Sequence, residues 1–430
     1  MKLTIRSVQP GEGRALGWSF AYFFCLLAGY YVLRPLRDEM GVAGGVRNLQ
    51  WLFTATFLTM LVAVPIYGAL VARLPRRRFI PVVYHFFVAN LAIFWLLLTL
   101  GIEREIVARV FFVWISVFVL FAVSVFWSYM ADLFTSEQGK RLFAFIAAGG
   151  AAGALAGPAL TIGLVELLGP ANLLIVAALF VEGAVFCVRR LEHAAPAAET
   201  KISEKSAALV LGGGWFDGFL LLLRSPYLAG ITLWVSLLSV AATFLYFQQA
   251  NIVAAASDDP AVRTRLFASV DLAVGVLTII VQAFATGKLI ARFGIGAALA
   301  LLPFVFAAGF AALAAAPVLA VVIGFQALQR TANFAISNPA REVLFTVVAR
   351  EEKYKAKNVI DILAVRGADA AGGWLFAVLR SLGMELRAIS LVAIPIAAAC
   401  LALAVALGRA QERRAARPAT ASGSDAEHLA

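Results

Sequence analysis

The chain has 430 residues, of which 62% are hydrophobic and 14% are charged, and its mean hydropathy is +0.89. These values lie outside the range of soluble domains, and the longest polar stretches, 189–205 and 409–430, are too short to form an appended soluble domain. The net charge of +11 comes from basic residues in short loops between apolar runs. This pattern orients helices in a bilayer and argues against nucleic acid as a partner.

Long apolar runs predict membrane-spanning helices. A span needs about 20 apolar residues, and unbroken runs of this length exclude a β-barrel. In the first half we expect spans at 15–39, 50–72, 79–101, 107–132, 141–167 and 170–188. In the second half we expect spans at 227–250, 265–290, 295–315, 318–348, 358–381 and 387–408. The first run lacks a convincing cleavage site, so it is interpreted as a retained helix.

A polar joint at 191–226 divides the chain into a first half at 1–190 and a second half at 227–409, followed by a tail at 410–430. An internal repeat supports this division, because GALVARLPRR at 68–77 matches GKLIARFGIG at 287–296 at an offset of 219 residues. Two parallel six-helix halves resemble the repeat plan of the major facilitator architecture. We therefore predict an all-α integral membrane fold with about twelve transmembrane helices.

Basic residues predict the orientation of the spans. They gather in the loops after the even-numbered spans and at both ends of the chain, which predicts cytoplasmic termini. Four arginines in odd-numbered loops weaken this asymmetry: Arg104, Arg109, Arg263 and Arg265. The sequence shows no nucleotide-binding loop, nucleophile elbow or metal-binding motif, so we predict no enzyme, no metal and no cofactor.

Charged residues inside spans are the strongest functional signal, because each costs about 2.5–3.5 kcal/mol at a helix centre. In the first span, Arg34 shares a helix face with both Arg37 and Asp38. These residues are interpreted as a cationic lining for an anionic substrate. The alternative is an interfacial cluster whose side chains reach out to water.

Other spans contribute further candidates for substrate binding. In the fourth span, Trp127 and Tyr129 are placed to stack on a substrate, although an aromatic pair at the membrane interface is the favoured alternative. Gln248 and Gln249 lie late in the seventh span. In the tenth span, Arg330 is too deep to reach water easily, and it is followed by two further polar residues, Asn333 and Asn338.

A second set is predicted to gate or couple transport. Arg341 and Glu342 are interpreted as a breakable gate pair, and Arg366 and Asp369 are close enough along a helix to neutralise each other. The complete set is Asp132, Asp271, Arg341, Glu342, Lys355, Lys357, Asp361, Arg366 and Asp369. Small residues at 147–158 predict close helix packing rather than phosphate binding.

Several of these segments resemble the nucleotide (ATP/ADP) antiporter family of plastids and intracellular bacteria. LRPLRD at 33–38 is similar to the family pattern LRxxKD, with Arg37 in place of the substrate-contacting lysine. NPAREVLF at 338–345 and KYKAKNVID at 353–361 resemble DPxKEMAY and KxKGKxxxD, and Glu137, Lys140 and Arg141 match a third segment. The family's acidic residues in its fourth and seventh helices have no counterparts here.

The resemblance and the intramembrane arginines together predict a secondary transporter of an anionic organic solute, with a nucleotide as one candidate, working by alternating access. The alternative is a proton-coupled major facilitator exporter of a cationic or drug-like compound. The expected partners are membrane lipid and a small anionic solute. The resemblance implies a bacterial inner membrane, and the oligomeric state is left open, with a monomer as one option.

Overall fold

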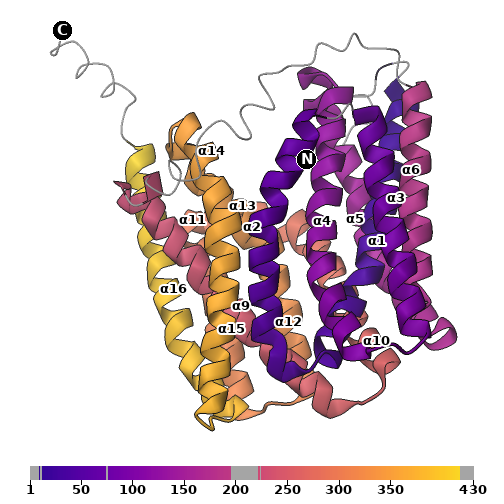
Figure 1. The fold of residues 1–430 in the computed structure, drawn as a ribbon. Helices are drawn as coiled ribbons and strands as arrows, with labels where there is room; N and C mark the ends of the chain where they lie inside the picture. Colours follow the sequence, from indigo (N-terminus) through magenta and orange to yellow (C-terminus); the bar gives the residue numbers. More distant parts are fainter. Residues whose placement is uncertain (1–8, 10–11, 74–75, 195–220, 223, 417–430) are drawn as a thin grey trace. The chain divides into compact units, whose positions relative to one another are not determined.

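The computed structural model consists of helices throughout its described part, which covers residues 9, 12–73, 76–194, 221–222 and 224–416 (Figure 1). Some side chains within these ranges, including those of Lys140 and Lys355, are not described. Two compact units are present. Unit 1 comprises Met1–Gly212 with Tyr246–Val276, and unit 2 comprises Gly213–Leu245 with Leu277–Ala430. The division of the chain into halves at 1–190 and 227–409 stays a prediction, and most of the 191–226 joint lies outside the described residues.

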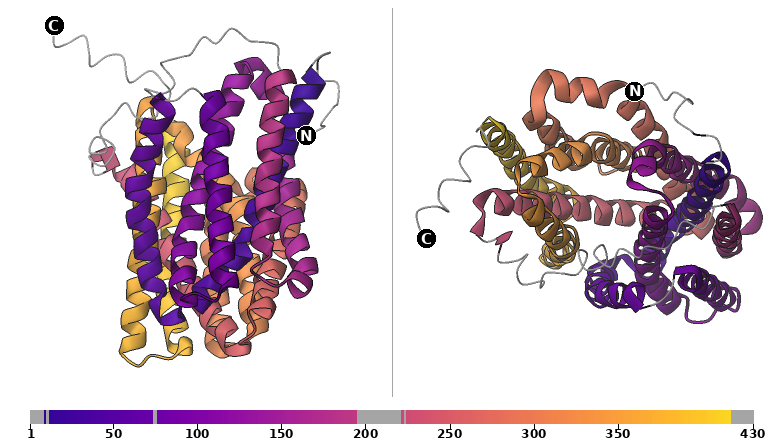
Figure 2. Two further views of the ribbon diagram at one scale, coloured as in Figure 1. Left: turned by 45° about the vertical axis from the view of Figure 1, so that its right-hand side comes forward. Right: turned by 90° about the horizontal axis from the view of Figure 1, so that it is seen from above.

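Unit 1 contains the first six long helices and parts of two more. The six are α1 (Glu12–Ala43), α2 (Leu49–Arg73), α3 (Arg76–Thr99), α4 (Arg104–Leu133), α5 (Ser136–Leu168) and α6 (Leu173–Ala194). Figure 2 shows them running along one common direction. The unit also includes the end of α9 (Pro226–Ala256) and most of α10 (Pro260–Val281).

Unit 2 contains the start of α9 and the helices that follow α10, several of them divided by short turns. In chain order these are the π-turn η3 (Gln282–Thr286), α11 (Gly287–Ala315), α12 (Leu319–Ala332), the π-turn η4 (Asn333–Ser337), α13 (Asn338–Leu344), the 3-10 turn η5 (Phe345–Val347), α14 (Arg350–Val359), the π-turn η6 (Ile360–Ala364), α15 (Val365–Ser381) and α16 (Leu386–Ala415).

The predicted fold class is confirmed. Nine helical stretches in the described residues are long and apolar enough to cross a membrane, and one of them, Pro260–Ala315, has 56 residues. A straight helix of that length would measure about 84 Å, far more than a bilayer of about 30 Å. It breaks at Gly294, where φ is +78°, and so it provides two spans. The helix α6 and the α14–α15 segment lie at the two remaining predicted spans, so all twelve predicted spans are helical in the described part of the chain.

Small residues let α5 pack directly against α1. A Cβ added to Gly153 would lie 2.4 Å from the Phe24 carbonyl oxygen and 2.8 Å from the Ala28 nitrogen, and Gly149 and Gly157 make similarly close approaches to α1. These glycines repeat every four residues and therefore lie on one helix face. The prediction that this stretch serves helix packing is confirmed.

We expect Gly153→Leu to prevent α1 and α5 from packing and to lower the yield of folded protein severely. The new side chain would meet backbone atoms, which cannot rotate away, so the overpacking cost is at least the usual 1–3 kcal/mol. Melting temperature in detergent is the measurement. Gly163→Leu in the same helix is the control, because a Cβ there meets nothing within 4 Å. Equal melting temperatures for the two variants would contradict this account of the packing.

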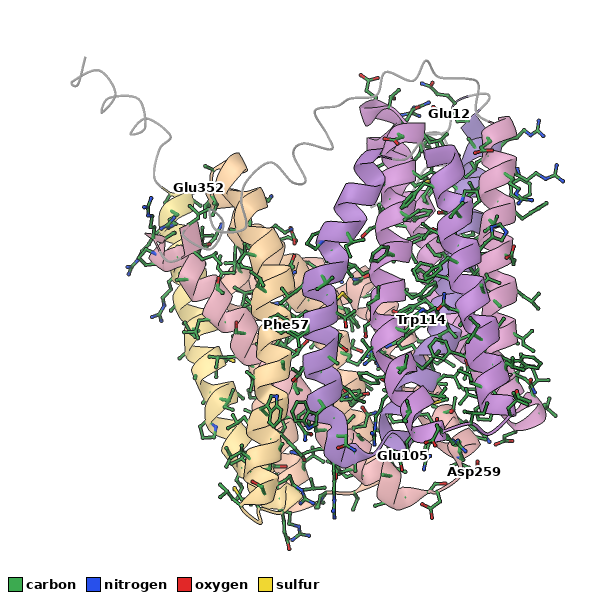
Figure 3. All side chains as sticks on the ribbon, viewed as in Figure 1. Glu12, Phe57, Glu105, Trp114, Asp259 and Glu352 are labelled. Atoms are coloured by element: carbon green, nitrogen blue, oxygen red, sulfur yellow. The ribbon has the colours of Figure 1, made fainter. Side chains whose placement is uncertain are left out.

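Aromatic side chains join α3 to α4 inside unit 1. The Trp114 ring stacks on Phe118 with the centroids 5.5 Å apart, and it meets Phe87 and Phe94 at 5.8 and 5.3 Å. Figure 3 shows Trp114 inside this helical layer. Offset and edge-to-face contacts of this kind add about 0.5–1.5 kcal/mol per pair to the burial of the rings.

Side chains of the π-turn η3 satisfy backbone carbonyls of the π-turn η4 in unit 2. Pro339 has no N–H, so the Ala335 carbonyl lacks its helical donor, and the Asn338 N–H bonds to Asn333 rather than to Phe334. Side chains of η3 replace both donors, because Thr286 donates to the Ala335 oxygen at 2.8 Å and Gln282 donates to the Phe334 oxygen at 3.2 Å. The sequence therefore places a hydroxyl and an amide where the helix needs them.

Thr286→Val is expected to destabilise the protein by about 1–3 kcal/mol, because it removes a donor from a buried carbonyl while keeping the shape of the side chain. Thermal unfolding in detergent measures the effect. Thr346→Val is the matched control, since the Thr346 hydroxyl is exposed and donates to the Val343 carbonyl oxygen of its own turn. A control that lowers stability as much as Thr286→Val would refute this role for Thr286.

Candidate functional site

Arg34 lies in the second half of α1, deep within the first span, and it forms an ion pair with α10. Its Nη1 is 3.7 Å from Oδ1 of Asp271, and their side chains are 18% and 1% exposed. A buried carboxylate facing a largely buried guanidinium in a spanning helix is costly unless the two are paired. The structure thus joins two residues that the sequence predicted separately.

Arg37 lies one turn further along α1 in an aromatic and acidic setting. Its Nη2 is 3.3 Å from Oδ1 of Asp38, and the same oxygen accepts a hydrogen bond of 3.1 Å from the Tyr246 hydroxyl. The guanidinium carbon lies 4.7 Å from the Phe112 ring centroid and 5.9 Å from that of Tyr246. Arg37 is therefore held in place by a carboxylate and by two ring faces.

Tyr246 and Phe112 were missed by sequence reasoning. Phe112 is one of many aromatic residues in an apolar run, and nothing in the sequence distinguishes it. Tyr246 precedes the predicted pair Gln248 and Gln249 by two residues, and this polar cluster late in an apolar helix was the available signal. Both glutamines are buried in unit 1, with exposures of 0% and 5%.

The charges of this arginine cluster balance. Arg34 and Arg37 face Asp271 and Asp38, so the four residues together have no net charge when all are ionised. An incoming anion must therefore displace an aspartate from an arginine, or bind where a guanidinium has hydrogen-bond donors to spare. Guanidinium groups suit both carboxylate and phosphate, because they donate two parallel hydrogen bonds.

Glu39, the residue after Asp38, forms a second network that the sequence did not predict. Its side chain is fully buried, 2.8 Å from Nη2 of Arg263 and 3.9 Å from Nη2 of Arg104. Arg263 also donates to the carbonyl oxygens of Ser257 and Asp258 in the loop before α10. This network joins the end of α1 to α4 and α10 at the end of unit 1 that Figure 3 marks by Glu105 and Asp259.

The four arginines that weaken the loop asymmetry all have acidic partners. Arg104 and Arg263 face Glu39, Arg109 bonds to Glu105 at 2.8 Å, and Arg265 pairs with Glu166. These arginines therefore act locally as counter-charges, which explains why they depart from the pattern of basic loops.

The predicted residues of α4 lie in different surroundings. Trp127 packs against Phe23, Phe126 and Phe143 with centroids 5.2 to 5.6 Å apart. Tyr129 is buried and meets Tyr22 edge-on, and Asp132 is exposed in the last turn of α4. These contacts favour a packing role for Trp127, and stacking on a substrate stays a prediction.

The segment after α4 that resembles the nucleotide antiporters forms the beginning of α5. Thr135 and Gln138 form a capping box at the beginning of α5. Gln138 and Arg141 both donate to the Glu12 carboxylate, at 3.1 and 2.9 Å. This segment fastens α5 to the first turn of α1.

The polar residues of the tenth span surround the π-turn η4 in unit 2. Arg330 lies in the last turn of α12, Asn333 opens η4, and Asn338 follows it. All three side chains are partly buried. A π-turn inside a spanning helix is frequently part of a functional site, so the structure adds a backbone feature to a position that the sequence selected by charge.

The predicted pairing of Arg341 with Glu342 is wrong. Adjacent residues on a helix point in different directions, and each of these two reaches the following helical segment instead. Nη1 of Arg341 is 3.2 Å from Oδ1 of Asp361, and the Lys357 amine is 2.7 and 2.8 Å from the two Glu342 oxygens. The two bridges tie α13 to α14 and η6, while the Lys355 side chain lies outside the described part of the chain.

The predicted pair in the eleventh span is confirmed, with Nη1 of Arg366 3.3 Å from Oδ2 of Asp369. Thr243 of α9 donates to the other oxygen of Asp369 at 3.5 Å. Asp369 is thus shared between its own helix and α9, as Asp38 is shared between Arg37 and Tyr246 in unit 1.

Comparison with known proteins gives a family. The model of the Major Facilitator Superfamily matches residues 16–356. No individual curated protein sequence matches the chain.

Solved transporter structures share its fold at low identity. The nucleoside transporter NupG is 12% identical, with a TM-score of 0.62 over 93% of this chain and 98% of its own. A POT family transporter in complex with a peptide conjugate is 12% identical, with a TM-score of 0.64 over 95% and 99%. A bacterial homologue of the iron transporter ferroportin is 13% identical, with a TM-score of 0.63 over 95% and 99%. Because the family model matches most of its length, the chain belongs to the Major Facilitator Superfamily of secondary transporters.

Proposed function

We propose that this transporter moves an anionic organic solute by alternating access, with a nucleotide as the first substrate to test. The observation behind the proposal is the arginine cluster of α1, in which Arg34 and Arg37 lie within a span and each faces an aspartate. Two guanidinium groups at this depth lower the stability of the fold. Binding an anionic group is the role that best accounts for their presence.

The arrangement suggests how a solute would be bound. Its anionic group would take the place of the Asp271 carboxylate beside Arg34, where the contact of 3.7 Å is looser than a direct hydrogen bond. Arg37, held by Phe112 and Asp38, would supply a second positive charge. The resemblance of LRPLRD to the nucleotide antiporters supports a phosphate-bearing solute.

The predicted gate residues of unit 2 would then act by exchanging partners. The bridges Arg341–Asp361 and Glu342–Lys357 are partly exposed, and exposed pairs of this kind are worth about 1 kcal/mol or less, so they can break during a transport cycle. We place the protein in a bacterial inner membrane with both termini in the cytoplasm, in line with the basic loops.

Uptake into proteoliposomes tests the proposal. Vesicles are preloaded with ATP, ADP, inorganic phosphate or a dicarboxylate, and uptake of the same labelled solutes is followed with and without a pH gradient. We expect one class of anion to enter, and stimulation by internal nucleotide would establish nucleotide exchange. Failure of every anion, tested with protein that is shown to be folded, would contradict the proposal.

A second candidate is proton-coupled export of a cationic compound. The observation in its favour is the set of buried acids Asp38 and Asp271, to which such a substrate would bind. Loss of cation efflux in Asp271→Asn, together with unchanged anion transport in Arg330→Ala, would select this alternative.

A further inference from the structure

A histidine–glutamate pair on the exposed surface of unit 1 joins α3 to α6, two helices that lie side by side (Figure 1). Nε2 of His85 is 3.5 Å from Oε2 of Glu182, and the two side chains are 46% and 41% exposed. His85 lies about 14 Å from the start of α3 and Glu182 about 18 Å from the end of α6, at the helical rise of 1.5 Å per residue. The pair is therefore well inside its spans, away from both helix ends.

The surface around the pair is apolar and faces outward. Val82 and Phe86 on α3 are 66% and 59% exposed, and Leu179 and Phe186 on α6 are 67% and 49% exposed. Such residues face lipid in a spanning bundle. Ionisable side chains on a lipid-facing surface are rare because they are costly there, even when paired.

The geometry of His85 fixes which groups meet. Its Nδ1 lies 2.7 Å from the Pro81 carbonyl oxygen, so Nδ1 carries a proton and Nε2 is the nitrogen that faces Glu182. A second polar cross-link joins the same helices further along, where the Trp95 indole N–H donates to Asn172 at 2.8 Å. Polar contacts thus join α3 to α6 at two positions along these helices, so the exposed face is already formed in a single copy.

We propose that this face is the interface of a homodimer, in which His85 of one copy contacts Glu182 of the partner subunit. The face is self-complementary in its polar groups, because each copy offers one imidazole and one carboxylate. A two-fold axis beside α3 and α6 brings the two pairs together in opposite order. The four side chains would then form one polar ring inside a protein interface, and neither pair would remain in lipid.

Cross-linking in membranes tests where the copies meet. Cys25, Cys187 and Cys400 are first replaced by alanine, so that introduced cysteines react alone. Leu179→Cys beside the pair is expected to give a cross-linked dimer with a short bismaleimide. Leu391→Cys is the control, because it is similarly exposed, at 57%, but lies on α16. No dimer at position 179, or equal amounts at both positions, would overturn the proposal.

Mixing two variants distinguishes a His85–Glu182 contact between copies from the same contact within one copy. His85→Ala and Glu182→Ala are each expected to weaken the dimer about five-fold or more, the effect of losing interhelical polar contacts. Co-expressed with different tags, the two variants should form a heterodimer, because one His85–Glu182 contact across the interface is intact. If the pair instead acts only within one copy, mixing the variants should not restore the dimer, because each copy lacks one member of the pair.

The conservative variant Glu182→Gln shows whether the fold survives, through its melting temperature and elution volume. Loss of the dimer without recovery in the mixture would show that the pair only fastens α3 to α6. Retention of a phospholipid that Glu182→Ala loses, without any cross-linking, would show that lipid covers the face. Either result would overturn the proposal, and both are independent of which solute is transported.

Discussion

Arg34→Ala is expected to lower transport of the anionic substrate by about 100-fold or more. The change removes a positive charge that we propose binds the substrate, and it leaves the Asp271 carboxylate, which is 1% exposed, without its arginine partner. Breaking a buried ion pair from one side costs about 3–5 kcal/mol. Initial rates of uptake into proteoliposomes, normalised to the amount of folded protein, are the measurement.

Three further variants separate the roles of the pair. Arg34→Lys keeps the charge but loses the two parallel donors, so it should retain part of the activity. Asp271→Ala combined with Arg34→Ala should recover folding but not transport. The exchange of the two residues, Arg34→Asp with Asp271→Arg, should likewise give a folded and inactive protein. Full activity of the exchanged protein would show that Arg34 serves structure alone.

Glu39→Ala should open the end of unit 1 at which α1, α4 and α10 meet. The change leaves Arg263 and Arg104 facing each other across a position that is now uncharged, and the expected destabilisation is about 3–5 kcal/mol. The loop held by Arg263 should loosen as well, because its carbonyl contacts depend on the position of that arginine. We expect Ser257→Cys in this background to react faster with a membrane-impermeant maleimide.

Glu105→Ala is the matched control for Glu39→Ala. Glu105 also pairs with an arginine of α4, at 2.8 Å, but its side chain is 69% exposed. Exposed pairs of this kind contribute about 1 kcal/mol or less. Similar labelling rates at position 257 in the two variants would count against a special role for the buried network.

Much of the fold follows from the sequence, because spanning helices are set by local composition. Apolar runs long enough to cross a bilayer predicted where the long helices lie, and the small residues around Gly153 predicted close helix packing, which the structure shows against α1. The pair of Arg366 and Asp369 was predictable for the same reason, since both partners lie within one helical turn.

The contacts between distant segments could not be predicted. Arg34 meets Asp271 and Asp38 meets Tyr246, and in both cases at least five long helices of the described chain lie between the partners. No periodicity within a helix selects such partners. The same limit explains the error at Arg341 and Glu342, whose proximity in sequence suggested a pair although the helix turns them toward different neighbours.

The π-turns determine where the chain can lose one residue without rotating the helix that follows. A π-turn holds one residue more than a regular helix needs for the same rise, so shortening the chain by one residue within 333–337 would leave Arg341 on its present face. The same deletion elsewhere in that span would rotate everything beyond it by about 100°. In an alignment of relatives, single-residue gaps should therefore gather at 282–286, 333–337 and 360–364, and be rare in the helices that flank them.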